Sequence, residues 1–73
     1  MHLPNIESFL DEGQITIGTL QPVGCVAIAN DDHNTLAMLK RRRGESLQDL
    51  LLRLDQAIAK AQDDEEFIDE VNG

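Results

Sequence analysis

Apolar and polar positions alternate in the first part of the chain and recur at helical spacing further on. Residues 14–20 alternate Ile15 and Ile17 with polar or small residues, which predicts a β-strand. The Pro and Gly of residues 21–24 predict a turn after this strand. Residues 4–13 precede the strand and predict a short helix that ends at the final glycine of that stretch. The chain is therefore expected to begin with a helix, a strand and a turn.

Residues 25–29, with the sequence CVAIA, predict a second strand. Because Val and Ile are larger apolar side chains than their neighbours, we expect Val26 and Ile28 to face the core. The opposite face then carries Cys25 and Ala27, which are small and weakly polar. The second strand is thus predicted to expose its smaller residues.

Residues 30–43 predict a helix directly after the second strand. The stretch opens with acids and closes with cations, a polarity that the helix macrodipole favours. Leu36 and Leu39 provide an apolar stripe at helical spacing. Gly44 fits the left-handed residue that commonly ends a helix. The pattern therefore predicts a helix end at residue 43.

A longer helix is predicted over residues 47–62. Ser46 is its expected N-cap, and Asp49 three residues later completes a capping-box pattern. Its apolar positions recur at helical spacing: Leu47, Leu50, Leu51, Leu54 and Ile58. The stripe is wide enough for burial on more than one side, which suits the core of a dimer.

The size and charge of the chain sharpen this interpretation. A chain of 73 residues with two Phe and no Trp or Tyr buries little surface, which favours oligomerisation. The net charge is −8, yet the acids are concentrated in residues 1–13 and 63–73, which contain no Lys or Arg. All six cations lie within residues 14–62. Because local charge decides where a phosphate can bind, the acidic total leaves a nucleic-acid partner open.

The expected location is the cytoplasm, with no membrane partner. The longest apolar stretch, residues 23–29, is too short to span a bilayer, and the first residues lack the basic region of a secretory signal. A lone Cys25 in an apolar run suits a reducing compartment. We therefore expect a soluble intracellular protein.

The predicted order of strand, helix, Gly-Glu-Ser turn and helix resembles the ribbon-helix-helix family of dimeric DNA-binding proteins. The resemblance covers about half the chain, residues 25–62. It implies an α+β fold in which one strand from each subunit forms an antiparallel β-ribbon that lies in the major groove. On this hypothesis residues 1–24 are an N-terminal extension with a short helix, a strand and a turn, and residues 63–73 are an acidic tail.

The resemblance also implies a function. Proteins of this family include plasmid repressors and antitoxins, so the expectation is a homodimeric transcriptional regulator that binds double-stranded DNA. The groove-facing ribbon residues would be Cys25 and Ala27, which carry no strong hydrogen-bond donor, so they would read thymine methyls or DNA shape. The start of the second helix would bind phosphate. The remaining DNA-binding residues are expected to be Ser46 and the neighbouring cations Lys40, Arg41, Arg42 and Arg43.

Alternatives remain open at this point. The cations at residues 40–43 fit a helix C-terminus that they neutralise as well as a set of phosphate contacts. Ser46 fits a plain N-cap as well as a phosphate ligand. The whole chain also fits a protein-interaction module on the same fold with little or no specific DNA binding. Its partner would then dock on an apolar face of the tail formed by Phe67, Ile68 and Val71.

Catalytic and metal-binding patterns are weak. Cys25 and His33 could suggest a thiol nucleophile, but no orienting Asn or Asp is identifiable and the chain is short for a substrate cleft. His2 and His33 lack the ligand spacing of a zinc site. We therefore expect no enzyme activity, no cofactor and no metal.

Overall fold

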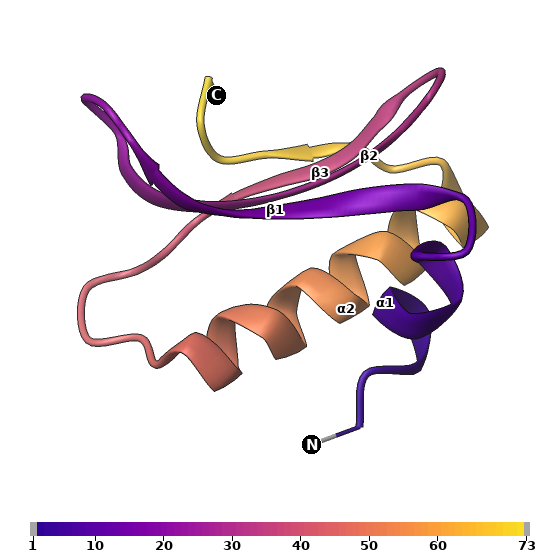
Figure 1. Cartoon of the computed structure of the whole chain (residues 1–73), viewed down its shortest axis with the longest axis horizontal. Helices are drawn as coiled ribbons and strands as arrows, with labels where there is room; N and C mark the ends of the chain where they lie inside the picture. Colours follow the sequence, from indigo (N-terminus) through magenta and orange to yellow (C-terminus); the bar gives the residue numbers. More distant parts are fainter. Residues whose placement is uncertain (1, 73) are drawn as a thin grey trace.

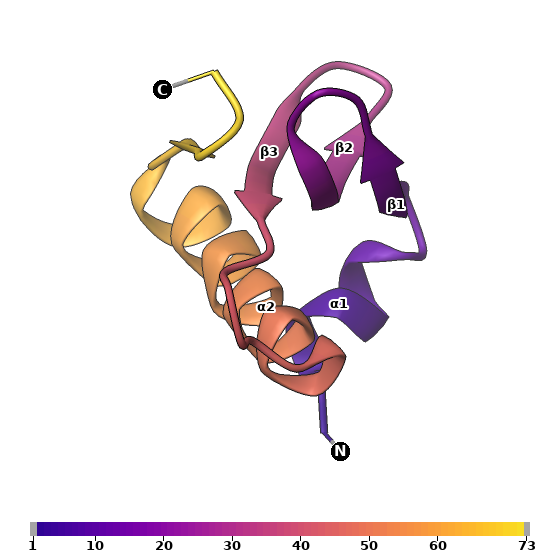
Figure 2. The same ribbon diagram turned by 90° about the vertical axis from the view of Figure 1, so that its left-hand side faces the viewer.

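The computed structural model, which describes residues 2–72, forms a four-stranded sheet with two helices packed against one of its faces (Figure 1). Figure 2 shows the same two layers from the side, with the longer helix running beneath the sheet. The elements in chain order are α1 (Pro4–Phe9), β1 (Gly13–Leu20), β2 (Gly24–Asp31), β3 (Thr35–Lys40), α2 (Leu47–Asp64) and β4 (Ile68–Asp69).

The strands lie in the order β1-β2-β3-β4. The pairs β1–β2 and β2–β3 are antiparallel, and β4 pairs with β3 in parallel. Segments expected to be an N-terminal extension and an acidic tail thus contribute strands to the same sheet as residues 25–40. The fold is α+β, as expected, but it is a mixed sheet rather than a two-stranded ribbon.

The ribbon-helix-helix prediction is therefore wrong. Residues 25–29 lie within β2, which has β1 on one side and β3 on the other. Because both edges of β2 are already paired, it has no free edge with which to form a ribbon with a second subunit. A dimer held by residues 25–29 is excluded by this pairing.

The helix predicted over residues 30–43 is also wrong, since Thr35–Lys40 forms β3. The Asp31 carboxylate accepts hydrogen bonds from the backbone N–H groups of His33 (2.9 Å) and Asn34 (2.7 Å), which turns the chain back on itself. After this turn Ala37 and Leu39 alternate into the core, with 0% and 2% exposure. An Asp-initiated turn therefore begins a hairpin where the sequence pattern suggested a helix start.

The prediction for the buried face of β2 is wrong as well. Ala27 and Ala29 are fully buried and belong to the core cluster under α2, while Cys25 packs against it. Val26 points to the opposite face by strand alternation and is nonetheless 3% exposed. Small residues face α2 because they let the helix approach the sheet closely.

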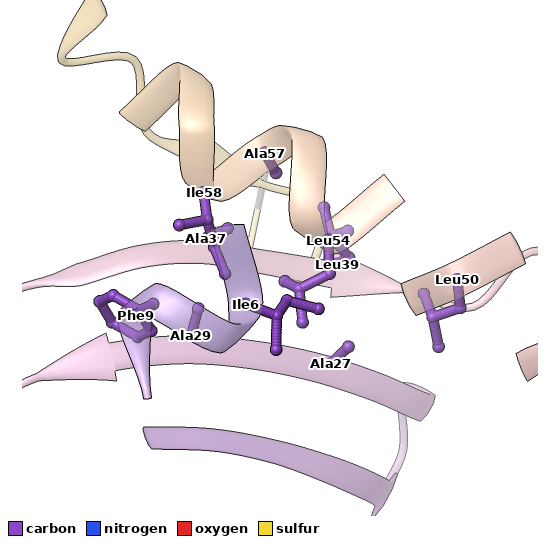
Figure 3. Close-up of a cluster of buried hydrophobic side chains, with 10 residues drawn as sticks. All are labelled: Ile6, Phe9, Ala27, Ala29, Ala37, Leu39, Leu50, Leu54, Ala57 and Ile58. Carbon is purple, nitrogen blue, oxygen red and sulfur yellow. The ribbon is translucent and has the colours of Figure 1, made fainter. Parts of the chain in front are cut away.

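The core lies between the sheet and the two helices (Figure 3). Ala27, Ala29 and Ala37 place small side chains on the inner face of the sheet, against which α2 packs larger apolar residues. The largest fully buried side chains are Phe9, Leu39, Leu50, Leu54 and Ile58. The predicted helix over residues 47–62 is confirmed as α2, and its N-cap is confirmed because Ser46 Oγ accepts from the Asp49 N–H at 3.0 Å.

The short first helix, α1, is confirmed but ends earlier than expected: it spans Pro4–Phe9, and Gly13, which was predicted to end it, is the first residue of β1. Its N-cap residue, Leu3, offers no side-chain acceptor. Instead the buried Asp55 carboxylate of α2 accepts from the backbone N–H groups of Asn5 and Ile6 and from Asn5 Nδ2, each at 2.9 Å. A residue far along the chain thus satisfies the free donors at the start of α1.

Candidate functional site: a cationic loop

Four consecutive cations, Lys40–Arg43, lie where β3 ends and the connection to α2 begins. We call this segment the cationic loop. All four residues are exposed. In Figure 1 the connection forms the open curve that leads to the start of α2. Their exposure leaves the predicted phosphate contacts sterically possible, and these contacts stay a prediction.

Glu45, in the same connection between β3 and α2, holds the backbone of the loop. Its carboxylate accepts from the Arg42 backbone N–H at 2.9 Å and from Arg53 through Nε at 2.7 Å and Nη2 at 2.9 Å. Arg53 first, and then the Arg42 N–H, lower the pKa of Glu45 from 4.5 to about 2. Glu45 is therefore ionised at neutral pH and fixes the backbone of the loop.

Arg53 joins this loop to the end of the chain. Its Nη1 donates to Glu70 Oε2 at 2.9 Å, and its Nη2 also donates to the Lys40 carbonyl at 3.0 Å. Glu70 in turn accepts from the Lys40 N–H at 3.0 Å. Hydrogen bonding to Glu45, followed by the charge of Glu70, raises the pKa of Arg53. The Glu45–Arg53–Glu70 network thus holds β3, β4 and α2 around the loop.

The cations of the loop itself remain largely uncommitted. Arg42 lies 3.8 Å from Glu70, but its side chain is 67% exposed, so this contact is weak. Arg41 Nε donates to the Glu45 carbonyl at 2.8 Å, which leaves its terminal nitrogens for other acceptors. Within residues 2–72, no salt bridge involves Lys40 or Arg43. Arg53 is therefore fully engaged in the network, whereas the side chains of the loop cations remain exposed to solvent.

The position of the loop overturns the capping interpretation. No helix precedes Lys40–Arg43, because the residues before them form β3. The cations instead lie just before the N-terminal end of α2, where the macrodipole is positive and favours anions. Their charges therefore do not stabilise a helix end. They add to a positive potential that the helix already creates.

The opposite end of α2 is acidic. Glu65 and Glu66 follow the helix and line an open hollow of about 500 Å³, together with Glu12, Asp31 and the half-exposed Phe67. An 18-residue helix is about 27 Å long, so this acidic end lies well away from the cationic loop. Charge is thus separated along the length of α2.

The other predicted site residues lie apart from the loop. Ala27 is fully buried and Cys25 is half-buried on the face that α2 covers, so neither is presented to a DNA groove. Ser46 is next to the loop but its Oγ is engaged as the N-cap of α2.

The expected apolar face of the tail is not formed. Ile68 belongs to β4 and packs against the core, while Phe67 is 52% exposed. Val71 follows in a turn in which the Asp69 carboxylate accepts its N–H at 3.0 Å. These residues therefore do not form one apolar face, and a protein partner that contacts them stays a prediction.

The network that supports the loop was not predicted from the sequence. Glu45, Arg53 and Glu70 are far apart in the chain, and no short spacing pattern connects them. The one available signal was Arg53 itself, a charged residue within the otherwise apolar run from Leu50 to Leu54. A cation inside such a run indicates a carboxylate partner beside the helix.

No other chemistry competes with the loop in the described part of the chain. Residues 2–72 contain no group of three His, Cys, Asp or Glu side chains placed to hold a metal ion. None of the helices in that range combines the length and apolarity needed to cross a bilayer.

Comparison with protein-family models matches no family, and comparisons with curated proteins and with solved structures return no similar protein.

Proposed function

We propose that this chain binds double-stranded DNA through phosphate contacts made by the cationic loop, without reading bases. One observation carries the proposal: four exposed cations stand at the positive end of a helix, which their charges do not stabilise. Charges placed against the local electrostatic preference indicate a role outside folding. A polyanion is the partner that fits such a site.

The chemistry of the loop suits a phosphate backbone. Arg guanidinium groups form paired hydrogen bonds with phosphate oxygens, and the loop offers three of them in a row. The Glu45–Arg53–Glu70 network fixes the loop backbone, so less conformational entropy is lost on binding. No strand is free to enter the major groove with the expected ribbon residues, because Ala27 is buried. Binding is therefore independent of sequence.

The acidic net charge does not oppose this proposal strongly. Of the acids near the loop, Glu45 and Glu70 are paired with Arg53, whereas the exposed Asp49 in the first turn of α2 forms no salt bridge within residues 2–72. The acids that follow α2 lie beyond Asp64, eleven residues or about 17 Å of helix from Arg53, which contacts Lys40 of the loop. This distance exceeds the Debye length of about 8 Å at physiological ionic strength, so their repulsion of phosphate is screened.

The test is a DNA titration of the triple variant Arg41→Gln, Arg42→Gln, Arg43→Gln. Fluorescence anisotropy with two unrelated duplexes should show that wild type binds both, and that the variant binds both more weakly. The slope of log affinity against log salt should flatten by about 0.9 for each phosphate that the variant no longer neutralises. Because the exposed side chains contribute little to packing, circular dichroism should show an intact fold.

The control is read against the single variant Arg43→Gln, so that each variant removes one charge. The control variant is Lys60→Gln: Lys60 is an exposed cation on α2 outside the loop, although it lines the same hollow as Arg42. This variant should keep the wild-type affinity and salt slope. An unchanged salt slope in the triple variant, or an equal loss of affinity in Lys60→Gln, would contradict the proposal.

A further inference from the structure

The free edge of β1 is the least protected surface of the sheet. β1 is eight residues long and lies at one end of the strand order, so one of its edges pairs with no strand of the described chain. Figure 2 shows it at the outer margin of the sheet. Its sequence, GQITIGTL, contains no charge and no proline. Charges and prolines are the features by which natural edge strands usually avoid pairing with another chain.

The other edge of the sheet is protected in the usual way. β4 has only two residues, and acidic Asp69 and Glu70 lie in it or directly after it. Glu70 is also tied to Arg53. By contrast β1 exposes Ile17 (40%) and Leu20 (43%). The two edges therefore differ in length, charge and apolar exposure.

The hydrogen-bond phase of the sheet shows which groups of β1 are free. The Arg41 N–H donates to the Cys25 carbonyl at 2.9 Å. Hydrogen-bonded pairs in an antiparallel ladder recur at every second residue, so the backbone N–H and C=O groups of the odd-numbered residues of β2 point toward β3. The backbone groups of the even-numbered residues of β2 consequently point toward β1, where their partners in the register are the even-numbered residues of β1. The backbone groups of the odd-numbered residues of β1 must then point outward: Gly13, Ile15, Ile17 and Thr19.

We propose that a second copy of this chain covers this edge, with the two β1 strands antiparallel and Thr16 on the twofold axis. In this register Gly13 faces the partner copy's Thr19 and Ile15 faces the partner copy's Ile17. Every outward-facing residue of β1 is then paired, and the exposed Ile17 gains a β-branched neighbour across the interface. If the twofold axis is moved by one residue in either direction, an outward-facing residue at one end of β1 faces a turn residue of the partner copy instead of a strand residue.

Charge favours a second copy in this antiparallel arrangement. Asp11 and Glu12 precede β1, while residues 20–23 at its other end carry no charge. Antiparallel pairing places the acids of one copy beside the uncharged end of the other. The two acidic ends are then separated by about eight residues of strand, roughly 27 Å, which exceeds the Debye length. A parallel arrangement would place the acids side by side.

Disulfide trapping tests this register. In a Cys25→Ser background, Thr16→Cys places two thiols on the axis, where the Cα atoms of a non-hydrogen-bonded pair lie about 4.5 Å apart, within disulfide range. Gln14→Cys and Gly18→Cys each place like thiols about 14 Å apart, too far for a bond. Gly18 has open space around its Cβ position, so a side chain is tolerated there. Mild oxidation should cross-link the Thr16→Cys variant selectively, while a mixture of the other two should form a heterodimer.

Sedimentation of the unmodified chain provides the second measurement. We expect a concentration-dependent monomer–dimer equilibrium, which Ile17→Lys shifts to monomer because each copy then carries a cation at the interface. Leu52→Lys is the control: Leu52 is 37% exposed on α2, and this variant should dimerise like wild type. Circular dichroism checks that each variant is folded.

Several results would overturn the proposal. Equal cross-linking at residues 14, 16 and 18, or no cross-linking at residue 16, would exclude this pairing. A monomer at every concentration up to about 1 mM would contradict pairing with a second copy and would favour an extended segment of another protein as the partner of β1. DNA binding by the loop is measured separately, so the failure of one proposal leaves the other standing.

Discussion

Two charged residues of α2, Arg53 and Asp55, each hold a different end of the chain to the same helix. They are two positions apart, which rotates them by about 200° around the helix axis. Arg53 faces the cationic loop and the C-terminal segment, whereas Asp55 faces α1. One helix therefore organises both ends of the protein through opposite charges on opposite sides.

The two contacts differ in environment. Asp55 is 7% exposed and accepts from backbone donors that would otherwise be unsatisfied. Arg53 has a side chain 21% exposed and pairs with Glu45, whose side chain is 8% exposed, and with Glu70, whose side chain is 30% exposed. Buried unsatisfied donors cost more than partly exposed ion pairs. We infer that Asp55 contributes mainly to stability and Arg53 mainly to the geometry of the loop.

The largest expected loss of stability comes from truncating the core residue that lies between Arg53 and Asp55 in α2. Leu54 lies between Arg53 and Asp55 and is fully buried. Leu54→Ala should lower the free energy of unfolding by about 2–5 kcal/mol through reduced burial and a cavity. Urea denaturation measures the change. Leu52→Ala, at a half-exposed position on the same helix, should change stability far less, and equal decreases would contradict this account of the core.

A smaller decrease is expected when the α1 contact alone is broken. Asp55→Asn removes the negative charge and places an amide donor opposite Asn5 Nδ2, so the free energy of unfolding should fall by about 1–3 kcal/mol. Asn5→Ala is the matched variant, since it removes one side-chain bond and leaves both backbone bonds to Asp55 in place. Urea denaturation should rank Asn5→Ala as the milder change. The reverse order would contradict the role of the backbone donors.

The smallest effect concerns the Arg53 contact and depends on pH. The pKa of Glu45 is lower in the folded protein, about 2, than its ordinary value of 4.5. Glu45 therefore stabilises the fold above about pH 4.5, and this contribution is lost as the pH falls toward 2. The difference in urea midpoint between wild type and Glu45→Gln should be greatest near neutral pH and vanish near pH 2. A difference that does not change with pH would exclude this linkage.

The sequence was sufficient for elements whose pattern is local. The alternation of Ile15 and Ile17 identified β1, and the Ser46–Asp49 pair located the start of α2. The leucines of α2 predicted its buried side correctly at Leu50 and Leu54. In each of these cases a local preference and the tertiary structure agree.

The pattern failed where two local signals competed. Leu36 and Leu39 fit a helical stripe, yet the inward pair in β3 is Ala37 and Leu39. The charge order of residues 30–43 also matched a helix, although its acids form a turn and its cations form a loop. Hairpin formation with β2 decided the outcome, and that pairing is not visible in the segment itself.

The remaining failures involve contacts between distant residues. The choice of Ala27 over Val26 for the α2 face depends on how closely the helix packs, which hydrophobicity alone does not reveal. The hydrogen bonds from Asn5 to Asp55 and from Arg53 to Glu70 join residues that only the folded chain brings together. The site was therefore predictable in its exposed cations but not in the network that supports them.

The alanine surface beneath α2 limits how this sequence can change over generations. Ala27, Ala29 and Ala37 are fully buried where the helix lies against the sheet, so a side chain much larger than alanine there would displace α2. Such a displacement would disturb the contacts at both ends of the chain at once. Inherited variation at these three positions should consequently be confined to Gly, Ala and Ser, while exposed positions on the outer side of α2 are free to diverge. Descendants of this protein would then be recognisable less by their large apolar residues than by three small ones.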